Sequence, residues 1–246
     1  MAAASISMQG PAVGDWGIIS LAISPVTARA AIAADVSVSG TFANSATSLT
    51  QTATLGASAN YLLAGVLGDS ASDLVTGVTY NSVAMTQLVK LYPGSTVGWL
   101  YVYGLPNPAT GSSHNLVVSA SGTCSTIGVT AQSYTNCSAT QPNVQVSAAF
   151  KAINTAWSVL VPLTPGCWGV SFLRYSASGS PRTQTCTSCG TVAALRTSEG
   201  TNGVLSIVDT NGTIPLLTPT TLTPNRAQWR LQRADLGRRR EQHLGS

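Results

Sequence analysis

Short apolar runs alternate along the chain with turn-forming residues, and the three strongest runs lie between residues 59 and 105. Each run is rich in β-branched and aromatic residues, and Gly, Asp, Ser, Asn and Pro separate the runs, which is typical of strands joined by turns. Asn81 and Ser82 interrupt the second run. We predict a two-residue hairpin turn there, because Asn tolerates a positive φ.

The third run carries large side chains on both faces of one strand. Trp99, Tyr101 and Tyr103 alternate with Leu100 and Val102. A strand with two bulky faces is central in its sheet, or its second face is covered by another sheet. Further strand patterns recur roughly every 8–12 residues along the chain, which is the spacing of sandwiches and barrels. We therefore predict an all-β fold, an antiparallel β-sandwich of the jelly-roll kind.

An apolar segment precedes this domain. Residues 1–30 form the segment, and we assign residues 31–224 to the sandwich. A secretory signal, with residues 18–23 as its apolar core, is one interpretation of the segment. Asp15 and the absence of Lys or Arg before that core argue against it. We favour a strand, whose five apolar positions are Trp16, Ile18, Ile19, Leu21 and Ile23.

Composition narrows the class of protein. Of 246 residues, 8 % are charged and 44 % hydrophobic, so solubility depends on Ser, Thr, Asn and Gly. Such a composition suits a secreted or particle-surface protein and is unusual for a cytosolic enzyme. No stretch approaches the ~18 apolar residues that a membrane span needs.

The net charge of +4 comes from the end of the chain. Residues 1–225 contain six basic and six acidic residues, whereas six arginines follow position 225. We predict that residues 225–246 form a poorly ordered Arg-rich tail. The alternatives are a basic tail that binds nucleic acid or an anionic surface, and a frame-disrupted chain end. The rest of the chain has no basic stripe for nucleic acid.

The cysteines favour structural disulfides in an oxidising compartment, with one cysteine left over. The candidates are Cys124, Cys137, Cys167, Cys186 and Cys189. Cys124 and Cys137 bracket a strand and a turn and could join neighbouring strands, but the sequence alone does not fix the disulfide pairing. Cys186 and Cys189 form a C-x-x-C motif, but no second such motif or His pair completes a zinc site.

Few residues are suited to catalysis. His114 precedes a strand and His243 lies in the tail, and no G-x-S-x-G motif is present. Asp69 and Asp73 are the only close carboxylate pair before residue 225. We expect them to form a turn and expect no cofactor; the alternative is a calcium site, which needs more oxygen ligands. We predict that the protein is not an enzyme.

Several stretches resemble a β-sandwich module found in bacteriophage virion proteins and in large bacterial secreted or surface proteins. The stretches that carry the resemblance are residues 62–70, 75–88, 99–108, 114–122 and 128–134. The final strand of such modules follows the pattern x-x-Trp-x-x-x-x-Leu-x-x-Pro. Here a similar pattern occupies residues 15–25, at the opposite end of the chain.

This displaced strand leads to a hypothesis about assembly. The strand completes a sheet that lacks its own last strand, either in cis or in a neighbouring subunit, where it builds a head-to-tail polymer. A fragment of a tandem array is the third interpretation.

We therefore expect a structural, assembly or adhesion module of an extracellular, cell or virion surface, whose partners are its own copies or other surface proteins. A carbohydrate-binding module is the alternative, with glycan stacking on exposed rings. The candidate aromatic residues are Trp16, Trp99, Trp157, Trp168, Trp229, Tyr92, Tyr101 and Tyr103.

Overall fold

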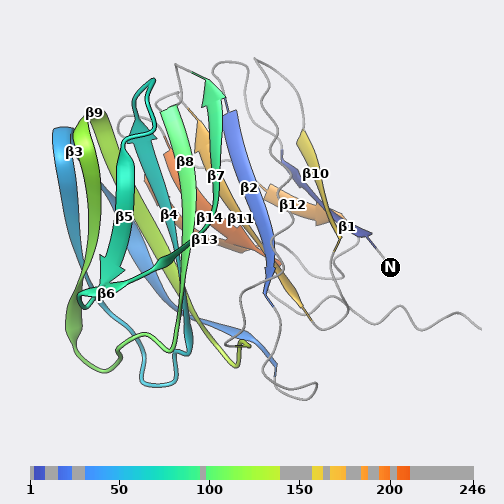
Figure 1. Ribbon diagram of the computed structural model, residues 1–246. Helices are drawn as coiled ribbons and strands as arrows, with labels where there is room; N and C mark the ends of the chain where they lie inside the picture. The colour runs from blue at the N-terminus through green and yellow to red at the C-terminus, as the bar shows by residue number, and fades with distance from the viewer. Residues whose placement is uncertain are drawn as a thin grey trace, which may run out of the picture. The chain divides into compact units, whose positions relative to one another are not determined.

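The computed structural model describes residues 3–8, 16–23, 31–94, 98–138, 157–162, 167–175, 184–187, 194–199 and 204–210. These residues form strands and turns, and none of them lies in a helix (Figure 1). Accordingly, no helix able to cross a membrane occurs in this part of the chain. The strands are β1 (Ala3–Met8), β2 (Trp16–Ile23), β3 (Ala33–Thr54), β4 (Tyr61–Asp69), β5 (Val75–Tyr80), β6 (Val83–Ala84), β7 (Thr86–Gly94), β8 (Gly98–Pro106), β9 (Ser113–Thr135), β10 (Trp157–Pro162), β11 (Trp168–Tyr175), β12 (Gln184–Thr187), β13 (Ala194–Glu199) and β14 (Val204–Asp209).

The strands form three sheets in which neighbours run antiparallel. The largest has seven strands in the order β6-β5-β9-β4-β8-β7, with β3 paired to β9. A second sheet has the order β13-β14-β11-β2, and a third has the order β10-β1-β12. The all-β, antiparallel part of the prediction is confirmed. The Arg-rich tail predicted over residues 225–246 lies outside the described residues.

The seven-stranded sheet curls into a nearly closed, barrel-like arrangement. The first half of β9 pairs with β5 and its second half with β4, while β3 follows β9 along both halves. The two ends of the strand order are β6 and β7. Only Met85 separates these two strands in the chain. The connection from β6 to β7 therefore brings the two ends of the sheet together.

The predicted hairpin turn is present. Tyr80 pairs with Val83 across it, and Asn81 and Ser82 have φ of 49° and 62°. Two consecutive positive φ values fit a turn whose twist matches that of the flanking strands. The turn confirms the prediction made from Asn81.

Two hydrophobic cores cover opposite faces of β4 and β8. We call the first the inner core; β4, β5, β8 and β9 supply most of it, and Leu62, Tyr101, Tyr103 and Leu116 are among its members. We call the second the outer core; there β2, β11 and β14 pack against the large sheet through residues that include Ile19, Leu63, Leu100, Phe172 and Ile207.

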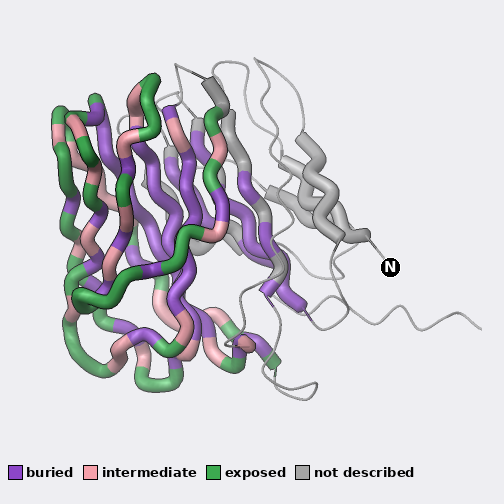
Figure 2. The backbone as a smooth tube through the Cα atoms, in the orientation of Figure 1, coloured by how far each residue is buried: buried purple, intermediate pink, exposed green. Residues whose placement is uncertain are grey.

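Because both faces are covered, β4 is buried from Tyr61 to Gly68, whereas much of β3 is exposed (Figure 2). The alternation in β8 follows the same rule, with Tyr101 and Tyr103 in the inner core and Leu100 and Val102 in the outer core. The prediction that this strand has two buried faces is confirmed. Gly65 faces the outer core, where the ring of Phe172 occupies the space that a side chain would need.

Candidate functional site

The large sheet has one interruption between β5 and β7, which we call the seam. β5 pairs with β6 and β7 pairs with β8, but β5 and β7 do not pair with each other. The chain crosses from one side to the other at Met85, whose N–H donates to the carbonyl of Val78 at 2.9 Å. Apart from this hydrogen bond, side chains rather than strand pairing fill the seam between β5 and β7.

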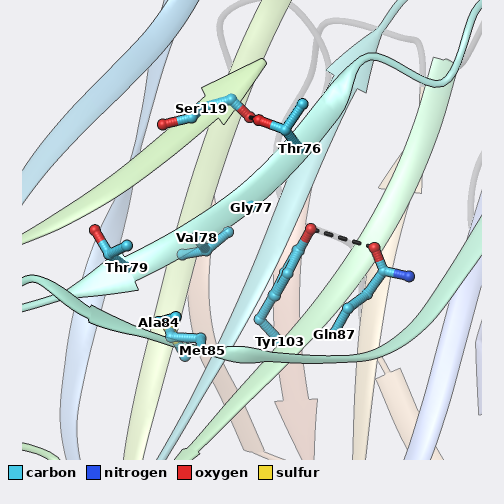
Figure 3. A pocket seen from close by; sticks show the side chains of 9 residues that line it. All are labelled: Thr76, Gly77, Val78, Thr79, Ala84, Met85, Gln87, Tyr103 and Ser119. Atoms are coloured by element: carbon cyan, nitrogen blue, oxygen red, sulfur yellow. Dashed lines mark hydrogen bonds between the residues drawn. The ribbon is translucent and has the colours of Figure 1, made fainter. Parts of the chain in front are cut away.

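A pocket of about 300 Å³ opens at one end of the seam (Figure 3). Its walls come from β5, from the connection of β6 to β7, and from single residues of β8 and β9. The hydroxyl of Tyr103 lies 3.3 Å from Oε1 of Gln87. The pocket lining carries hydroxyls, an amide and apolar groups but no charged side chain: Thr76, Gly77, Val78, Thr79, Ala84, Met85, Gln87, Tyr103 and Ser119.

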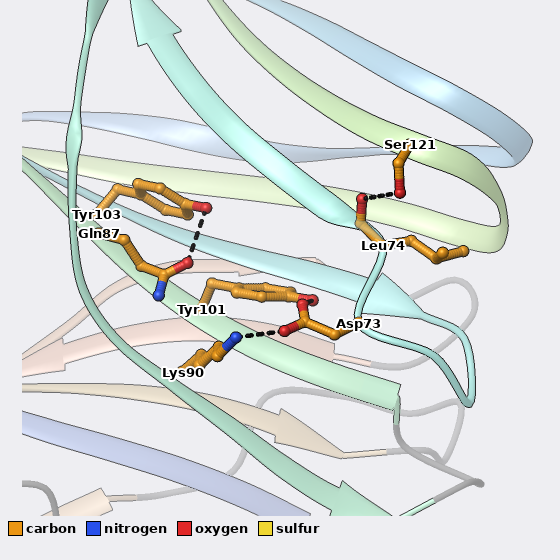
Figure 4. A network of polar contacts seen from close by, with 7 residues as sticks. All are labelled: Asp73, Leu74, Gln87, Lys90, Tyr101, Tyr103 and Ser121. Atoms are coloured by element: carbon orange, nitrogen blue, oxygen red, sulfur yellow. Dashed lines mark hydrogen bonds and ion pairs between the residues drawn. The ribbon is translucent and has the colours of Figure 1, made fainter.

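A polar network crosses the seam beyond this pocket (Figure 4). Asp73, in the loop before β5, forms an ion pair with Lys90 of β7 and accepts a hydrogen bond from the hydroxyl of Tyr101 at 2.6 Å. Burial raises the pKa of Asp73, but the hydrogen bonds from Lys90 and Tyr101 and the charge of Lys90 outweigh burial and leave the pKa below its ordinary value. Asp73 is therefore ionised at neutral pH and links the two sides of the seam.

A row of aromatic rings runs along the seam from the surface to the pocket. The centroids of Tyr92 and Trp99 are 4.9 Å apart, those of Trp99 and Tyr101 are 6.2 Å apart, and those of Tyr101 and Tyr103 are 6.4 Å apart. Tyr92 is 38 % exposed, whereas Tyr101 and Tyr103 are buried. The ammonium group of Lys90 lies 5.6 Å from the Trp99 ring, within cation–π distance.

The two buried tyrosines remain neutral at physiological pH. Burial first, and Asp73 second, raise the pKa of Tyr101 far above its ordinary value and that of Tyr103 to about 12. Their hydroxyls are therefore hydrogen-bond donors throughout the physiological range. The pocket end of the seam is suited to a neutral polar group rather than to an ion.

The structure places the predicted assembly strand in the same chain as its sheet. β2 pairs with β11 from Trp16 opposite Tyr175 to Ile23 opposite Trp168. Ile19, Leu21 and Ile23, three of the five apolar positions of the predicted strand, are fully or almost fully buried in the outer core. Trp16 and Ile18 lie in the strand, but their side chains are outside the described part.

The two candidate calcium ligands lie at opposite ends of one loop. Asp69 is the last residue of β4, and Asp73 is held by Lys90 and Tyr101. Among the described residues, no three His, Cys, Asp or Glu side chains gather around a common point. His114 lies in β9, where its Nε2 is 2.9 Å from the hydroxyl of Ser112 and its ring packs edge-on against Tyr80.

The disulfide prediction is wrong for Cys124 and Cys137, which are free thiols. Cys124 lies in the inner core and Cys137 in the outer core, so the sheet itself separates them. Burial, and secondarily Asp69, raises the pKa of Cys124, and burial raises that of Cys137 to about 12. Cys167 is also buried. The side chain of Cys186 and the whole of Cys189 lie outside the described residues.

The aromatic candidates divide between core and surface. Trp168 is buried in the outer core, and only Tyr92 and Trp99 combine a ring stack with access to solvent. The side chains of Trp16 and Trp157, and all of Trp229, fall outside the described residues. Lys90 and Gln87 were not among the predicted site residues. Their spacing in the sequence does not reveal that they lie beside the seam, because this depends on how β7 pairs with β8.

The chain was compared with known protein families, curated proteins and solved structures. No family model, no curated protein and no solved structure matches it.

Proposed function

We propose that the protein is a non-catalytic structural, assembly or adhesion module of an extracellular or virion surface, and that its copies join head-to-tail by exchanging β2. The observation that carries the proposal is the origin of the second sheet. Its strands β11, β13 and β14 come from the far end of the chain, and the N-terminal strand β2 completes it at the edge.

This sheet is suited to strand exchange. β2 and β11 pair over eight consecutive residues, and β2 contributes Ile19, Leu21 and Ile23 to the outer core. A neighbouring copy can supply the same strand and make the same contacts. Exchange therefore costs little free energy beyond the translational and rotational freedom that the copies lose on association. Since the donor and the acceptor sites differ, such contacts are heterologous, and where the rotation between copies does not close a ring they continue from copy to copy.

The surface composition also supports the proposal. The strands β3 and β9 present Ser, Thr and Asn outward, and the chain has only 8 % charged residues. Neutral polar strands are what particle-surface β proteins use for solubility, as in the modules that the sequence resembles. The sandwich arrangement expected from that resemblance is part of this proposal, and the outer core between the two sheets supports it.

A cysteine pair across β2 and β11 tests the exchange. Ser20 lies opposite Ser171, and directly paired strand residues have Cβ atoms about 4.5–5.5 Å apart, so Ser20→Cys with Ser171→Cys forms a disulfide after mild oxidation. We expect a ladder of covalent oligomers on a non-reducing gel. The single variants Ser20→Cys and Ser171→Cys control for the native cysteines.

A covalent monomer with an internal disulfide, and no ladder at any protein concentration, would overturn head-to-tail exchange. Mixing the two single variants sharpens the test further, because only exchange between copies links them. Mass spectrometry of the linked peptides then identifies the bond.

Glycan binding is a second candidate function, and one observation favours it. Tyr92 is one of two large hydrophobic residues exposed among the described residues, and it forms with Trp99 a ring pair that continues toward a neutral, hydroxyl-lined pocket. Sugars stack on such rings and hydrogen-bond to hydroxyl and amide groups.

Calorimetric titration with neutral oligosaccharides tests this second function. We expect Tyr92→Ala to abolish binding and Val83→Ala, at the other exposed hydrophobic residue, to leave it unchanged. Equal binding by both variants would contradict a sugar platform at Tyr92.

A further inference from the structure

The outer edge of β3 is open along residues 48–54. On one side this segment pairs without interruption with β9, from Ser48 opposite Ser119 to Thr54 opposite Ser113. On its other side no strand among the described residues pairs with it, because β3 pairs only with β9 (Figure 1). Unpaired N–H and C=O groups along such an edge are a template for another strand. Within the segment, the carbonyl of Thr52 accepts an exposed hydrogen bond from the side-chain amide of Gln51 at 3.2 Å, which a second strand would replace.

The side chains of this segment alternate between two faces, with Gln51 half-buried between Leu49 and Ala53. Leu49 and Ala53 are buried in the inner core, and the residues between and beside them with exposed side chains are Ser48, Thr50, Thr52 and Thr54. The segment contains no charged residue, no proline and no glycine. Its sequence therefore lacks the features that usually keep strand edges apart.

The edge that β7 forms at one end of the large sheet has those features. β7 carries Lys90 and Pro93, and its pairing with β8 is irregular at two places. The first part of β3 is also irregular, with shifts in register up to the one between Ala46 and Ser48, and Ser45 has a positive φ of 49°. Residues 48–54 are thus a neutral edge with uninterrupted pairing, in contrast to β7 and to the first part of β3.

We propose that this edge binds the same edge of a second copy, antiparallel and related by a two-fold axis at Gln51. A two-fold axis on a residue pairs positions of equal parity, so each exposed side chain faces an exposed one and each buried side chain faces a buried one. The pairing places Thr50 opposite Thr52 of the second copy, and hydroxyl pairs of this kind stabilise antiparallel strands.

The identity of the occupant follows from the neutrality of the edge. A charged partner strand finds no complementary charge on residues 48–54, whereas two copies of the edge meet without like-charge repulsion. The two large sheets then continue into one another across the dimer. This contact uses β3 and is independent of the exchange of β2, so each is tested separately.

A single-cysteine scan tests the axis. In a background with Cys186→Ser and Cys189→Ser, we compare Gln51→Cys with Ser48→Cys during mild oxidation. On the two-fold axis each residue 51 faces its own copy, whereas the two residues 48 lie about 20 Å apart at ~3.4 Å per residue. We expect Gln51→Cys to form a covalent dimer at least about tenfold faster, because a disulfide does not span the longer distance.

Lysine variants test the same edge without a covalent bond. Thr50→Lys with Thr52→Lys places like charges opposite each other across the axis, and we expect dimerisation to weaken by at least about tenfold in sedimentation equilibrium. Asn115→Lys with Ser119→Lys is the matched control, because these exposed residues lie in β9, one strand in from the edge. We expect the control to dimerise like the parent.

Three results would overturn the proposal: a parent protein that shows no dimer at any accessible concentration, equal cross-linking at positions 51 and 48, or equal dimerisation of the two lysine variants. None of these results depends on the Ser20 and Ser171 cross-link. Failure here therefore leaves the strand-exchange proposal to its own test.

Discussion

The inner and outer cores cover opposite faces of the same strands, but different parts of the chain build them. Every buried member of the inner core lies between Val38 and Ala131. The outer core adds Ile19, Leu21 and Ile23 from the N-terminal strand and Phe172, Leu205 and Ile207 from strands that follow residue 167. The central strands thus belong to a locally assembled core on one face and to a core of distant segments on the other.

This difference teaches how β4 and β8 gain their two buried faces. The strands that cover the inner face follow one another in the chain through short turns. The outer face is covered by β2 and by strands that follow residue 167. Both faces of β4 and β8 are apolar, so each face exposes hydrophobic surface to water until its covering strands pack against it. The following predictions compare the two faces.

The largest effect is expected from truncation of neighbouring leucines in β4. Leu62 faces the inner core and Leu63 the outer core, and both are almost fully buried. We expect Leu62→Ala and Leu63→Ala each to lower the free energy of unfolding by about 2–5 kcal/mol in urea titrations. Val83→Ala, at an exposed position, is the control. A cost for Leu63→Ala no larger than that of the control would show that the outer core is not packed in solution.

A smaller effect is expected where the layers approach most closely. A Cβ at Gly65 would overlap the ring of Phe172, whereas one at Gly77 meets no atom within 4 Å. We expect Gly65→Ala to lower the free energy of unfolding by about 1–3 kcal/mol through overpacking, and Gly77→Ala to change it by less than about 0.5 kcal/mol. Adding Phe172→Leu should restore part of the loss. Additive effects of the two changes would contradict the contact.

The sequence predicts the local half of this comparison. The alternation from Trp99 to Tyr103 indicates two buried faces, and Asn81 with Ser82 indicates the turn, because period and turn chemistry are written in neighbouring residues. The sequence predicts the strand β2 from its own run of apolar residues in the same way. These predictions succeed because each depends on fewer than ten consecutive residues.

The non-local half could not be predicted in the same way. Nothing in a single sequence pairs Gly65 with Phe172, or Asp73 with Lys90, since pairing register between distant strands sets these contacts. The disulfide prediction failed at Cys124 and Cys137 for the same reason. Cys124 and Cys137 are near in sequence, with twelve residues between them, but they lie in opposite cores.

The next effect is expected from removing one tyrosine hydroxyl in the outer core and one in the seam. Tyr134 donates to Oδ2 of Asp209 at 3.1 Å in a fully buried contact between the two sheets, whereas Tyr103 reaches Gln87 at 3.3 Å in the half-buried seam. We expect Tyr134→Phe to cost about 1–3 kcal/mol and Tyr103→Phe about 0.5–1.5 kcal/mol, because removing a hydrogen bond costs more where both groups are fully buried. Thermal unfolding of both variants measures the difference. The reverse order would indicate that water reaches the contact at Asp209.

The smallest effect concerns the ion pair that closes the seam. The folded-state pKa of Asp73 lies below its ordinary value, so the unfolded chain binds the proton more tightly. The stabilisation is therefore complete above about pH 4, near the unfolded pKa, and is lost as the pH falls through the lower folded pKa. The side chains of Lys90 and Asp73 are 44 % and 30 % exposed, so we expect less than about 1 kcal/mol. Urea midpoints of the parent and Asp73→Asn, compared from neutral pH to pH 2, should converge at low pH, and in the Lys90→Gln background the gap at neutral pH should shrink. A gap that widens as the pH falls would contradict the sign of the pKa shift.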